Sequence, residues 1–264
     1  MSIEEMIKKY FPDELKEPEA FEDWLSPIRE NANPGAVDLL DALEKRLTTE
    51  KEIREKESHI RRDYWELFGG NDKLLKSVSS IHSKLTRDLL DELKKGGSAI
   101  SRQTKEELAN RVYGFSDLGR IRIVADFPSD IDHLMRILFD SKLFLGSYSC
   151  PKGIKDFVFD PQLRDGLKGH RARQFSIRVK IDVQSDFGFE IQLMTRLQHA
   201  WDRRNHPLYE WQRENQDWQK DPDAVELAVD DFACSEALHL VDRQADINWI
   251  RLQNKLKNSK EVTS

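Results

Sequence analysis

Two stretches in the second half of the chain alternate between apolar and polar residues, and they limit the possible folds more than any other feature. In RQFSIRVKIDV (173–183) and in FGFEIQLM (187–194), every second residue is apolar. A period of two is typical of a β-strand with one buried face and one solvated face. The short polar segment QSD (184–186) between them predicts a β-hairpin.

A three-residue turn in this hairpin would set the register of the two strands. The facing pairs would be Val183 with Phe187, Lys180 with Glu190, and Arg178 with Gln192. Acidic and basic side chains would then share one solvated sheet face, where carboxylates can hold Mg²⁺ and cations can neutralise phosphate oxygens. The alternative is an ordinary solvated face with cross-strand ion pairs.

The rest of the chain reads mainly as helices around further strands. We expect helices over 36–69, 71–95, 104–113, 129–141 and from about 221 onward, a strand over 120–127, and a long loop over 150–169. The predicted class is α+β: a mixed, about five-stranded sheet flanked by helices, with N- and C-terminal helical extensions. The expected division is an extension over 1–69, a central domain over 70–215, and a C-terminal helical segment over 216–264.

Two of the predicted helices have recognisable N-terminal caps. Ser129 or Asp130 would cap the helix that follows the 120–127 strand. TRLQ (195–198) matches a Thr-x-x-Gln capping box, which would let the second hairpin strand pass directly into a helix.

The composition limits the cellular compartment and the kinds of partner that we expect. The net charge of −6 argues against a general attraction to nucleic acid. Two distant cysteines predict unpaired thiols, and the N-terminus has no apolar signal-peptide core, so we expect a cytoplasmic protein. No run of about 18 apolar residues is present, so no membrane partner is expected.

Five short segments, in this order, resemble motifs of the synthetase domain of RelA/SpoT-type alarmone synthetases. They are KSVSSIHSKLTR (76–87), SDLGRIRIVADFPSD (116–130), KDF (155–157), GHRARQ (169–174) and EIQLMTRLQHAWDRRNHPLY (190–209). The resemblance covers about residues 70–215. It implies transfer of the β,γ-diphosphate of ATP to the 3′-hydroxyl of GDP or GTP, giving (p)ppGpp, with Mg²⁺ as cofactor.

The same resemblance implies a role for each matching residue. Asp117 and Glu190 would be catalytic and would share the magnesium ion, with Glu190 also helping to deprotonate the acceptor hydroxyl. The residues implied to bind ATP are Lys76, Ser80, Lys84 and Arg122, and those implied to face the acceptor are Lys155, His170, Gln192, His206 and Tyr209.

The departures from the family pattern gather on the acceptor side. His170 stands where the family has the tyrosine that stacks on guanine, and Gln174 and Met194 replace a histidine and an arginine. Gly119 and Arg120 stand where Ala-Gly is more usual. A local basic group of Lys168, Arg171 and Arg173 would suit a phosphorylated nucleotide or the 3′ end of an RNA.

Two alternatives follow from these departures. One is a toxin-like relative that pyrophosphorylates adenine nucleotides or tRNA 3′ ends. The other is a degenerate domain that binds a nucleotide or protein without turnover. The amphipathic terminal helices would suit a second copy of the chain or an antitoxin protein.

Overall fold

The protein folds around one mixed β-sheet, as predicted. The computed structural model describes residues 3–58, 64–68, 74–95, 103–140, 152–158, 169–182, 185–215 and 217–261. The strands are β1 (Trp65–Phe68), β2 (Gly119–Ala125), β3 (Lys152–Asp156), β4 (Arg173–Lys180) and β5 (Asp186–Thr195). Their order in the sheet is β1-β2-β5-β4-β3, with β2 and β5 parallel and the other neighbours antiparallel.

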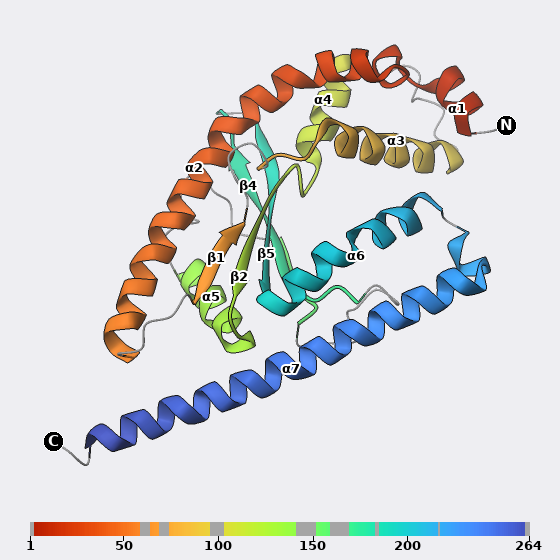
Figure 1. Ribbon diagram of the computed structural model, residues 1–264. Coiled ribbons are helices and arrows are strands. Elements are labelled where there is room, and N and C mark those ends of the chain that lie inside the picture. Colours follow the sequence, from red (N-terminus) through yellow and green to blue (C-terminus); the bar gives the residue numbers. More distant parts are fainter. Residues whose placement is uncertain are drawn as a thin grey trace.

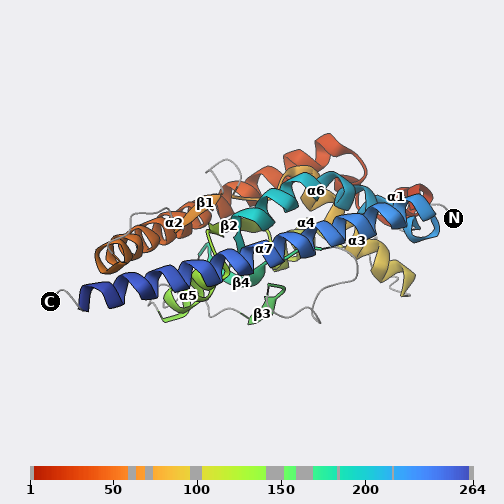
Figure 2. The ribbon, with the colours of Figure 1, turned by 60° about the horizontal axis from the view of Figure 1, so that its bottom comes forward.

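Helices surround this sheet, and the two longest lie on opposite sides of it (Figure 1). They are α1 (Ile3–Tyr10), α2 (Pro18–Ser58), α3 (Val78–Lys94), α4 (Lys105–Gly114), α5 (Pro128–Asp140), α6 (Arg196–Glu214) and α7 (Pro222–Glu261), with short 3₁₀ turns at Asp13–Leu15 and Trp218–Lys220. Figure 2 shows α7 running past both α6 and α5. The α+β class and the terminal helical extensions are therefore confirmed.

The first long helix differs from the prediction at both ends. It begins at Pro18 rather than at residue 36, contains Pro27 and Pro34, and arches over the sheet (Figure 1). Proline removes a backbone hydrogen bond and bends a helix, which suits a helix that wraps around a core. The segment 65–68 is not helical, because it pairs with β2 as an antiparallel edge strand. The predicted end of this helix, at residue 69, lies outside the described residues.

The hairpin is present, but its predicted register was wrong. The turn is longer than three residues: Ile181 N–H donates to the Ser185 carbonyl at 2.9 Å, and Ser185 N–H donates to the Asp182 carboxylate at 2.7 Å. The observed pairs are Lys180 with Asp186, Arg178 with Gly188, Ser176 with Glu190 and Gln174 with Gln192. The error is an even number of residues, so each side chain keeps its predicted face. Val183 lies outside the described residues.

The predicted loop over 150–169 contains the edge strand β3, and residues 159–168 of it lie outside the described residues. The short length of β3 explains why periodicity missed it. Lys155 and Asp156 pair with Gln174 and Arg173 of β4. This pairing, rather than a local pattern, makes the segment a strand.

The two predicted helix caps had different outcomes. Thr195 is the N-cap of α6, and its hydroxyl accepts a hydrogen bond from Gln198 N–H at 3.3 Å. The side chain of Gln198 donates to the Ser235 carbonyl instead of completing the box. The cap predicted for α5 was wrong, because the helix starts at Pro128, and the Asp130 carboxylate accepts from the Phe127 N–H from within the first turn.

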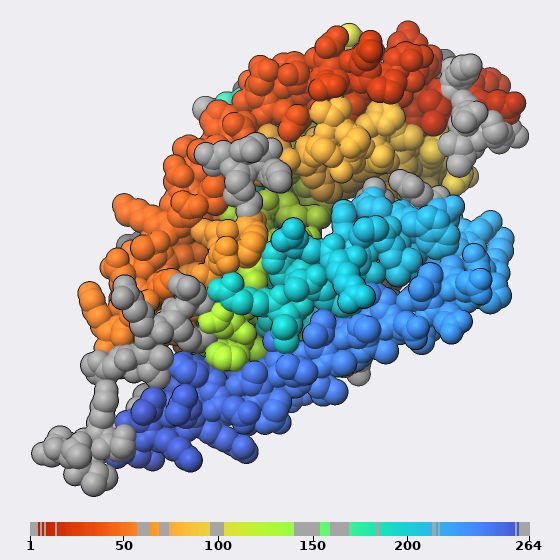
Figure 3. Space-filling view, in the orientation of Figure 1, coloured from red at the N-terminus to blue at the C-terminus, as the bar shows by residue number. Residues whose placement is uncertain are grey.

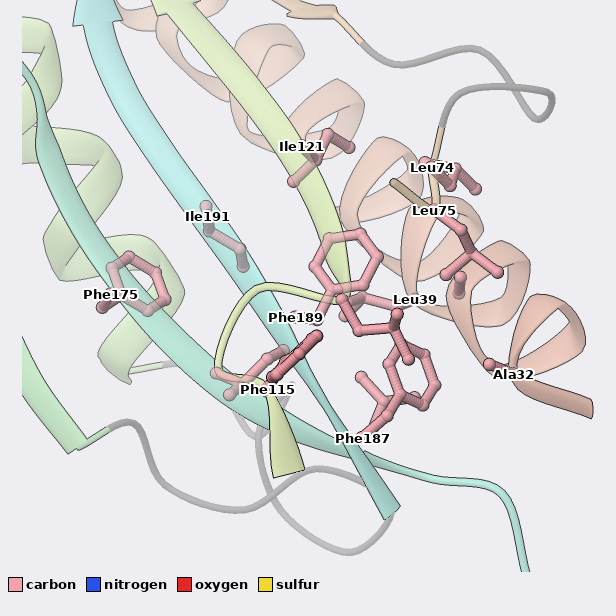
Figure 4. Packing of buried hydrophobic residues seen from close by; sticks show 14 of the residues in the cluster. Ala32, Leu39, Leu74, Leu75, Phe115, Ile121, Phe175, Phe187, Phe189 and Ile191 are labelled. Atoms are coloured by element: carbon pink, nitrogen blue, oxygen red, sulfur yellow. The ribbon is translucent and has the colours of Figure 1, made fainter. Parts of the chain in front are cut away.

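The apolar face of the sheet forms the hydrophobic core with α2, α3, α4 and α5. Figure 4 shows Phe187 and Phe189 of β5 close to Leu39 of α2 and to Phe115, which follows α4. Because this face is filled with buried apolar side chains, charged groups of β2 and β5 must use the opposite face. None of the described helices combines the length and the hydrophobicity that a membrane span requires.

Candidate active site

The polar face of the sheet carries the candidate active site. Parallel pairing of β2 with β5 places Arg120 beside Glu190 and Arg122 beside Gln192, and Gln174 of β4 pairs with Gln192 from the other side. Side chains directly opposite each other in a sheet lie close enough to interact. The pairing therefore builds a row of charges and amides across three strands.

A glycine on β5 lets the loop before β2 cross this face. A Cβ atom at Gly188 would lie 2.1 Å from the Phe115 carbonyl oxygen and 2.6 Å from the Ser116 backbone. Only glycine permits such a close approach of two backbones. The crossing holds the loop that carries Asp117 on the same face as Glu190, two residues further along β5.

Asp117 is held by two lysines from a neighbouring segment. Lys76 N–H donates to the Leu118 carbonyl at 2.9 Å, and Arg120 N–H donates to the Leu74 carbonyl at 2.8 Å, so the chain before α3 pairs with the start of β2. The ammonium groups of Lys76 and Lys84 both donate to the Asp117 carboxylate. The backbone pairing with β2 thus places Lys76 beside Asp117, and Lys84, in the second turn of α3, reaches the same carboxylate.

Burial and charge act in opposite directions on the pKa values of this cluster. Burial raises the pKa of the Asp117 carboxyl, but the hydrogen bonds and charges of Lys76 and Lys84 outweigh it and lower the pKa to about 2. Burial lowers the pKa of Lys76, and Asp117 opposes that shift. Two cations facing one carboxylate leave an excess positive charge, which suits an anionic ligand.

Arg120 connects the two candidate catalytic carboxylates. Its Nε lies 2.8 Å from Glu190 Oε1, and its Nη2 lies 3.6 Å from Asp117 Oδ2. Glu190 Oε1 also accepts a hydrogen bond from Gln192 Nε2 at 2.8 Å. Both carboxylate side chains are only 14% exposed. A single cationic group therefore lies within reach of both acids.

A second polar cluster continues along the same face. Arg122 Nε donates to Gln192 Oε1 at 3.1 Å, and its Nη2 lies 2.7 Å from Asp202 Oδ2 of α6. His170 Nδ1 lies 3.0 Å from Asp202 Oδ1. Burial raises the pKa of Asp202, but the His170 hydrogen bond and the charges of His170 and Arg122 outweigh it and bring the pKa to about 2. Asp202 is therefore ionised at neutral pH.

Two cavities adjoin at this face, and we call them the phosphate pocket and the aromatic pocket. The phosphate pocket, about 660 Å³, is lined by Arg29, Leu75, Lys76, Ser77, Val78, Ser80, Lys84, Arg87, Asp117, Arg120, His206, Tyr209 and Glu210. The aromatic pocket, about 270 Å³, is lined by Arg120, Arg122, Phe157, Gly169, His170, Gln174, Glu190, Gln192, Trp201, Asp202, Asn205, His206 and Tyr209. Helices α3 and α6, which line the phosphate pocket, lie next to each other in Figure 3.

The charge balance differs between the two pockets. Among the described residues, five lysines and arginines but only two carboxylates line the phosphate pocket. Two arginines and two carboxylates line the aromatic pocket, together with three aromatic rings and two histidines. The first pocket suits a polyphosphate, and the second suits a base or sugar with little net charge.

Most of the residues predicted from the sequence meet at these pockets. Lys76, Ser80, Lys84 and Asp117 line the phosphate pocket, His170, Glu190 and Gln192 line the aromatic pocket, and His206 and Tyr209 line both.

Two predicted residues lie elsewhere. Arg122 was expected on the ATP side, but it lines the aromatic pocket, because Gln192 and Asp202 hold it there. Lys155 is exposed on the edge strand β3, opposite Gln174, and does not line either pocket.

The predicted basic group near residue 170 is not an exposed patch. Arg171 is 4% exposed, and it donates to the Val158 carbonyl and to Glu236 of α7. Arg173 pairs with Asp156 and with Asp132. Lys168 lies outside the described residues. Both arginines are therefore used to attach α7, α5 and β3 to the sheet.

Sequence reasoning missed several residues of the site. Arg120 was noted only as a departure from the family pattern. Its position beside Glu190 follows from the pairing of β2 with β5, which the sequence does not show. Arg29 comes from α2, far from Lys76 in the chain, and no local motif indicates it. Asp202 and Phe157 lie within matching segments, but which of their neighbours face them depends on how α6 and β3 pack.

The two carboxylates fit a magnesium site that a substrate would complete. Within the described residues, no group of three or more histidines, cysteines or carboxylates could hold a metal ion alone. Mg²⁺ is usually held by one or two carboxylates together with substrate phosphates and water. Asp117 and Glu190 both reach the guanidinium of Arg120, so a cation can lie between them.

Comparisons with known proteins agree on the fold. The sequence matches no protein-family model and no curated protein. The small alarmone synthetase 1 from Bacillus subtilis, bound to its product pppGpp, is 18% identical and superposes with a TM-score of 0.54 over 89% of this chain and 99% of its own. A GTP pyrophosphokinase family protein from Streptococcus pneumoniae is 16% identical, with a TM-score of 0.54 over 89% and 95% of the two chains.

A third solved structure extends the likeness. The small alarmone synthetase 2 from Bacillus subtilis is 19% identical, with a TM-score of 0.53 over 84% of this chain and 96% of its own. The chain therefore has the fold of the small alarmone synthetases. At these identities the similarity establishes the architecture.

Proposed function

We propose that the protein is a nucleotide pyrophosphokinase, which transfers the β,γ-diphosphate of ATP to the 3′-hydroxyl of a guanine nucleotide. The observation that carries this proposal is the meeting of two unlike pockets at Arg120, with Asp117 on the cation-rich side and Glu190 on the aromatic side. A transfer reaction between two nucleotides needs such a pair of adjoining sites.

The phosphate pocket would hold the triphosphate of ATP. Lys76 and Lys84 each donate one hydrogen bond to Asp117, and the remaining N–H donors of both ammonium groups could bind phosphate oxygens. Arg29 and Arg87 add positive charge around the same space. Positioning and neutralisation of this kind supply most of the catalysis in phosphoryl transfer.

Asp117 and Glu190 would bind the magnesium ion together with the phosphates. When bound, the ion would neutralise charge that develops on the phosphate oxygens. The guanidinium of Arg120 would then turn from the carboxylates toward the phosphates. Gln192 would keep Glu190 oriented through its amide.

The aromatic pocket would hold the acceptor nucleoside. The rings of Phe157, His170 and Tyr209 offer stacking surfaces for a base. Because Arg171 and Arg173 are committed to internal ion pairs, the chain offers less for a tRNA end than its sequence indicated. A guanine or adenine mononucleotide therefore fits better than an RNA.

The test is a transfer assay with labelled ATP. The purified protein is incubated with Mg²⁺ and with GDP, GTP, ADP or deacylated tRNA in turn, using ATP labelled at the γ-phosphate in one series and at the α-phosphate in another. Transfer of a diphosphate puts the γ label on the acceptor and converts the α label to AMP. Formation of ADP instead would indicate a simple kinase.

The second candidate is a nucleotide-binding module without turnover. The observation that favours it is the ion pair between Arg120 and Glu190, which occupies a carboxylate needed for the metal. ATP binding in the absence of transfer to any of the four acceptors would support this alternative and overturn the first.

A further inference from the structure

His170 and Asp202 form a carboxylate–imidazole pair within the aromatic pocket. Gly169, with φ of +62°, lies against α6, because a Cβ atom there would be 2.8 Å from Trp201 Cζ2. This left-handed turn presses the next residue toward the helix. As a result, His170 Nδ1 lies 3.0 Å from Asp202 Oδ1.

The pair determines which nitrogen of His170 carries the proton. Asp202 has a pKa of about 2, so its carboxylate is ionised and can only accept hydrogen bonds. The Nδ1 atom of His170 must therefore donate. In the neutral ring, Nε2 then has a free lone pair, and no described residue forms a hydrogen bond with it.

Glu190, the other candidate base, is less available. Its Oε1 contacts both Arg120 Nε and Gln192 Nε2 at 2.8 Å. A carboxylate oxygen that already faces a guanidinium and accepts a hydrogen bond from an amide has less capacity to take a further proton from a hydroxyl group. The imidazole lies in the same pocket, and its side chain is 28% exposed.

We propose that His170 is the general base of the reaction and that Asp202 positions it. This assignment rests on the proposed function and adds a catalytic residue to it. Nε2 of His170 takes the proton of the acceptor hydroxyl while the oxygen lone pair forms a bond to the β-phosphorus of ATP. The bond from the β-phosphorus to the bridging oxygen breaks, its electron pair leaves on AMP, and the imidazolium returns its proton to solvent.

The competing role for His170 is stacking on the acceptor base, and one substitution separates the two roles. His170→Phe keeps an aromatic ring of similar width but removes the base. We expect kcat to fall by about 100-fold or more, the usual effect of losing a general base, with the acceptor KM changed less than about threefold. Asp202→Asn should lower kcat by at least about tenfold, because an amide in place of the carboxylate no longer fixes the tautomer of the ring.

The dependence of kcat on pH gives an independent readout. In the wild type, kcat should rise with pH, because a general base acts only in its unprotonated form, and this rise should be absent in His170→Phe. The other ionisable side chains that line this pocket are Asp202, Arg122, Arg120, Glu190, His206 and Tyr209. Because His206 also lines this pocket, His206→Gln is measured as well, and the rise should persist in it.

A matched control lies outside the site. His133 of α5 contacts Glu50 of α2 at the same 3.0 Å and stacks on Trp65. His133→Phe removes a similar pair and should leave kcat unchanged, and thermal unfolding checks that every variant folds.

The outcomes separate this assignment from the proposed function. Wild-type transfer with a His170→Phe variant that retains kcat and the pH profile would overturn the base assignment alone. Absence of transfer by the wild type would overturn both. Loss of kcat and of the pH-dependent rise in His170→Phe, but not in His133→Phe, is the expected result.

Discussion

Asp242 of α7 provides a prediction whose size follows directly from the structure. It is 4% exposed and accepts a hydrogen bond from the Thr195 hydroxyl at the start of α6, while Asp246 lies one helical turn further along. Burial raises the pKa of the Asp242 carboxyl to about 6 from its ordinary value of 3.8, with Asp246 adding to the rise and Thr195 opposing it. The carboxyl therefore resists ionisation in the folded protein.

This shift has a definite sign for stability. Because the pKa of Asp242 is higher in the folded than in the unfolded protein, the protonated carboxyl favours the folded state. Its contribution to the free energy of unfolding is complete below about pH 4 and is lost as the pH rises through 6. The difference between a pKa of 3.8 and one of about 6 corresponds to roughly 3 kcal/mol of folding stability, of which about half is lost by pH 5 and the rest by about pH 8. Asp242→Asn keeps an acceptor for Thr195 and removes the charge.

We therefore expect Asp242→Asn to increase the free energy of unfolding at pH 8 by about 1–3 kcal/mol, and by about half as much at pH 5. Urea unfolding at several pH values measures this difference. The difference in the free energy of unfolding between the variant and the wild type at each pH removes the contribution of other titrating groups. These include His133 and His199, whose pKa values burial lowers. Asp230→Asn, at an exposed site on the same helix, is the control.

A variant no more stable than the wild type at pH 8 would refute the argument. So would a stability gain that does not change between pH 5 and pH 8, because it would show that Asp242 is not the titrating group.

The remaining predictions concern the site and its support. Asp117→Ala and Glu190→Ala should each lower transfer by more than tenfold, at least about 1.4 kcal/mol, while circular dichroism shows an intact fold; activity above a tenth of wild type in both would reject the metal assignment. Arg171→Ala should lower the free energy of unfolding by about 1–3 kcal/mol, because the Val158 carbonyl and Glu236 lose their hydrogen bonds to this buried guanidinium. Thermal or urea unfolding measures the loss. A change only in the salt dependence of acceptor use would contradict this prediction. Gly188→Ala should lower stability by at least about 1–3 kcal/mol and also lower transfer, since its Cβ would meet backbone that cannot move aside; a neutral result would show that the crossing loop is adaptable.

The arrangement of α7 explains why a helix that contributes no described residue to the lining of the two pockets matters for them. Its carboxylates Asp242 and Asp246 accept hydrogen bonds from Thr195, at the start of α6, and from Ser129, in the first turn of α5. Since α6 carries Asp202 and lines both pockets, the position of α7 affects the site through α6.

Sequence alone was enough for the features that depend on local periodicity and local hydrogen bonding. Strict alternation predicted both strands of the hairpin and the face on which Glu190 and Gln192 lie, because side chains in a strand alternate between faces whatever the register. Thr195 was identifiable as a cap, since its hydroxyl bonds within its own first turn. The motifs around Lys76, Asp117 and Glu190 also indicated which residues would meet.

Only the tertiary structure decided features that depend on contacts between distant segments. β1 and β3 are strands because neighbouring strands supply their hydrogen bonds, which no local pattern shows. The same holds for the place of Arg122 in the aromatic pocket and for the burial of Arg171, both of which depend on carboxylates from helices far along the chain. From the sequence alone, a charged residue is predicted to be exposed. Only the packed structure shows the partner of opposite charge that makes its burial possible.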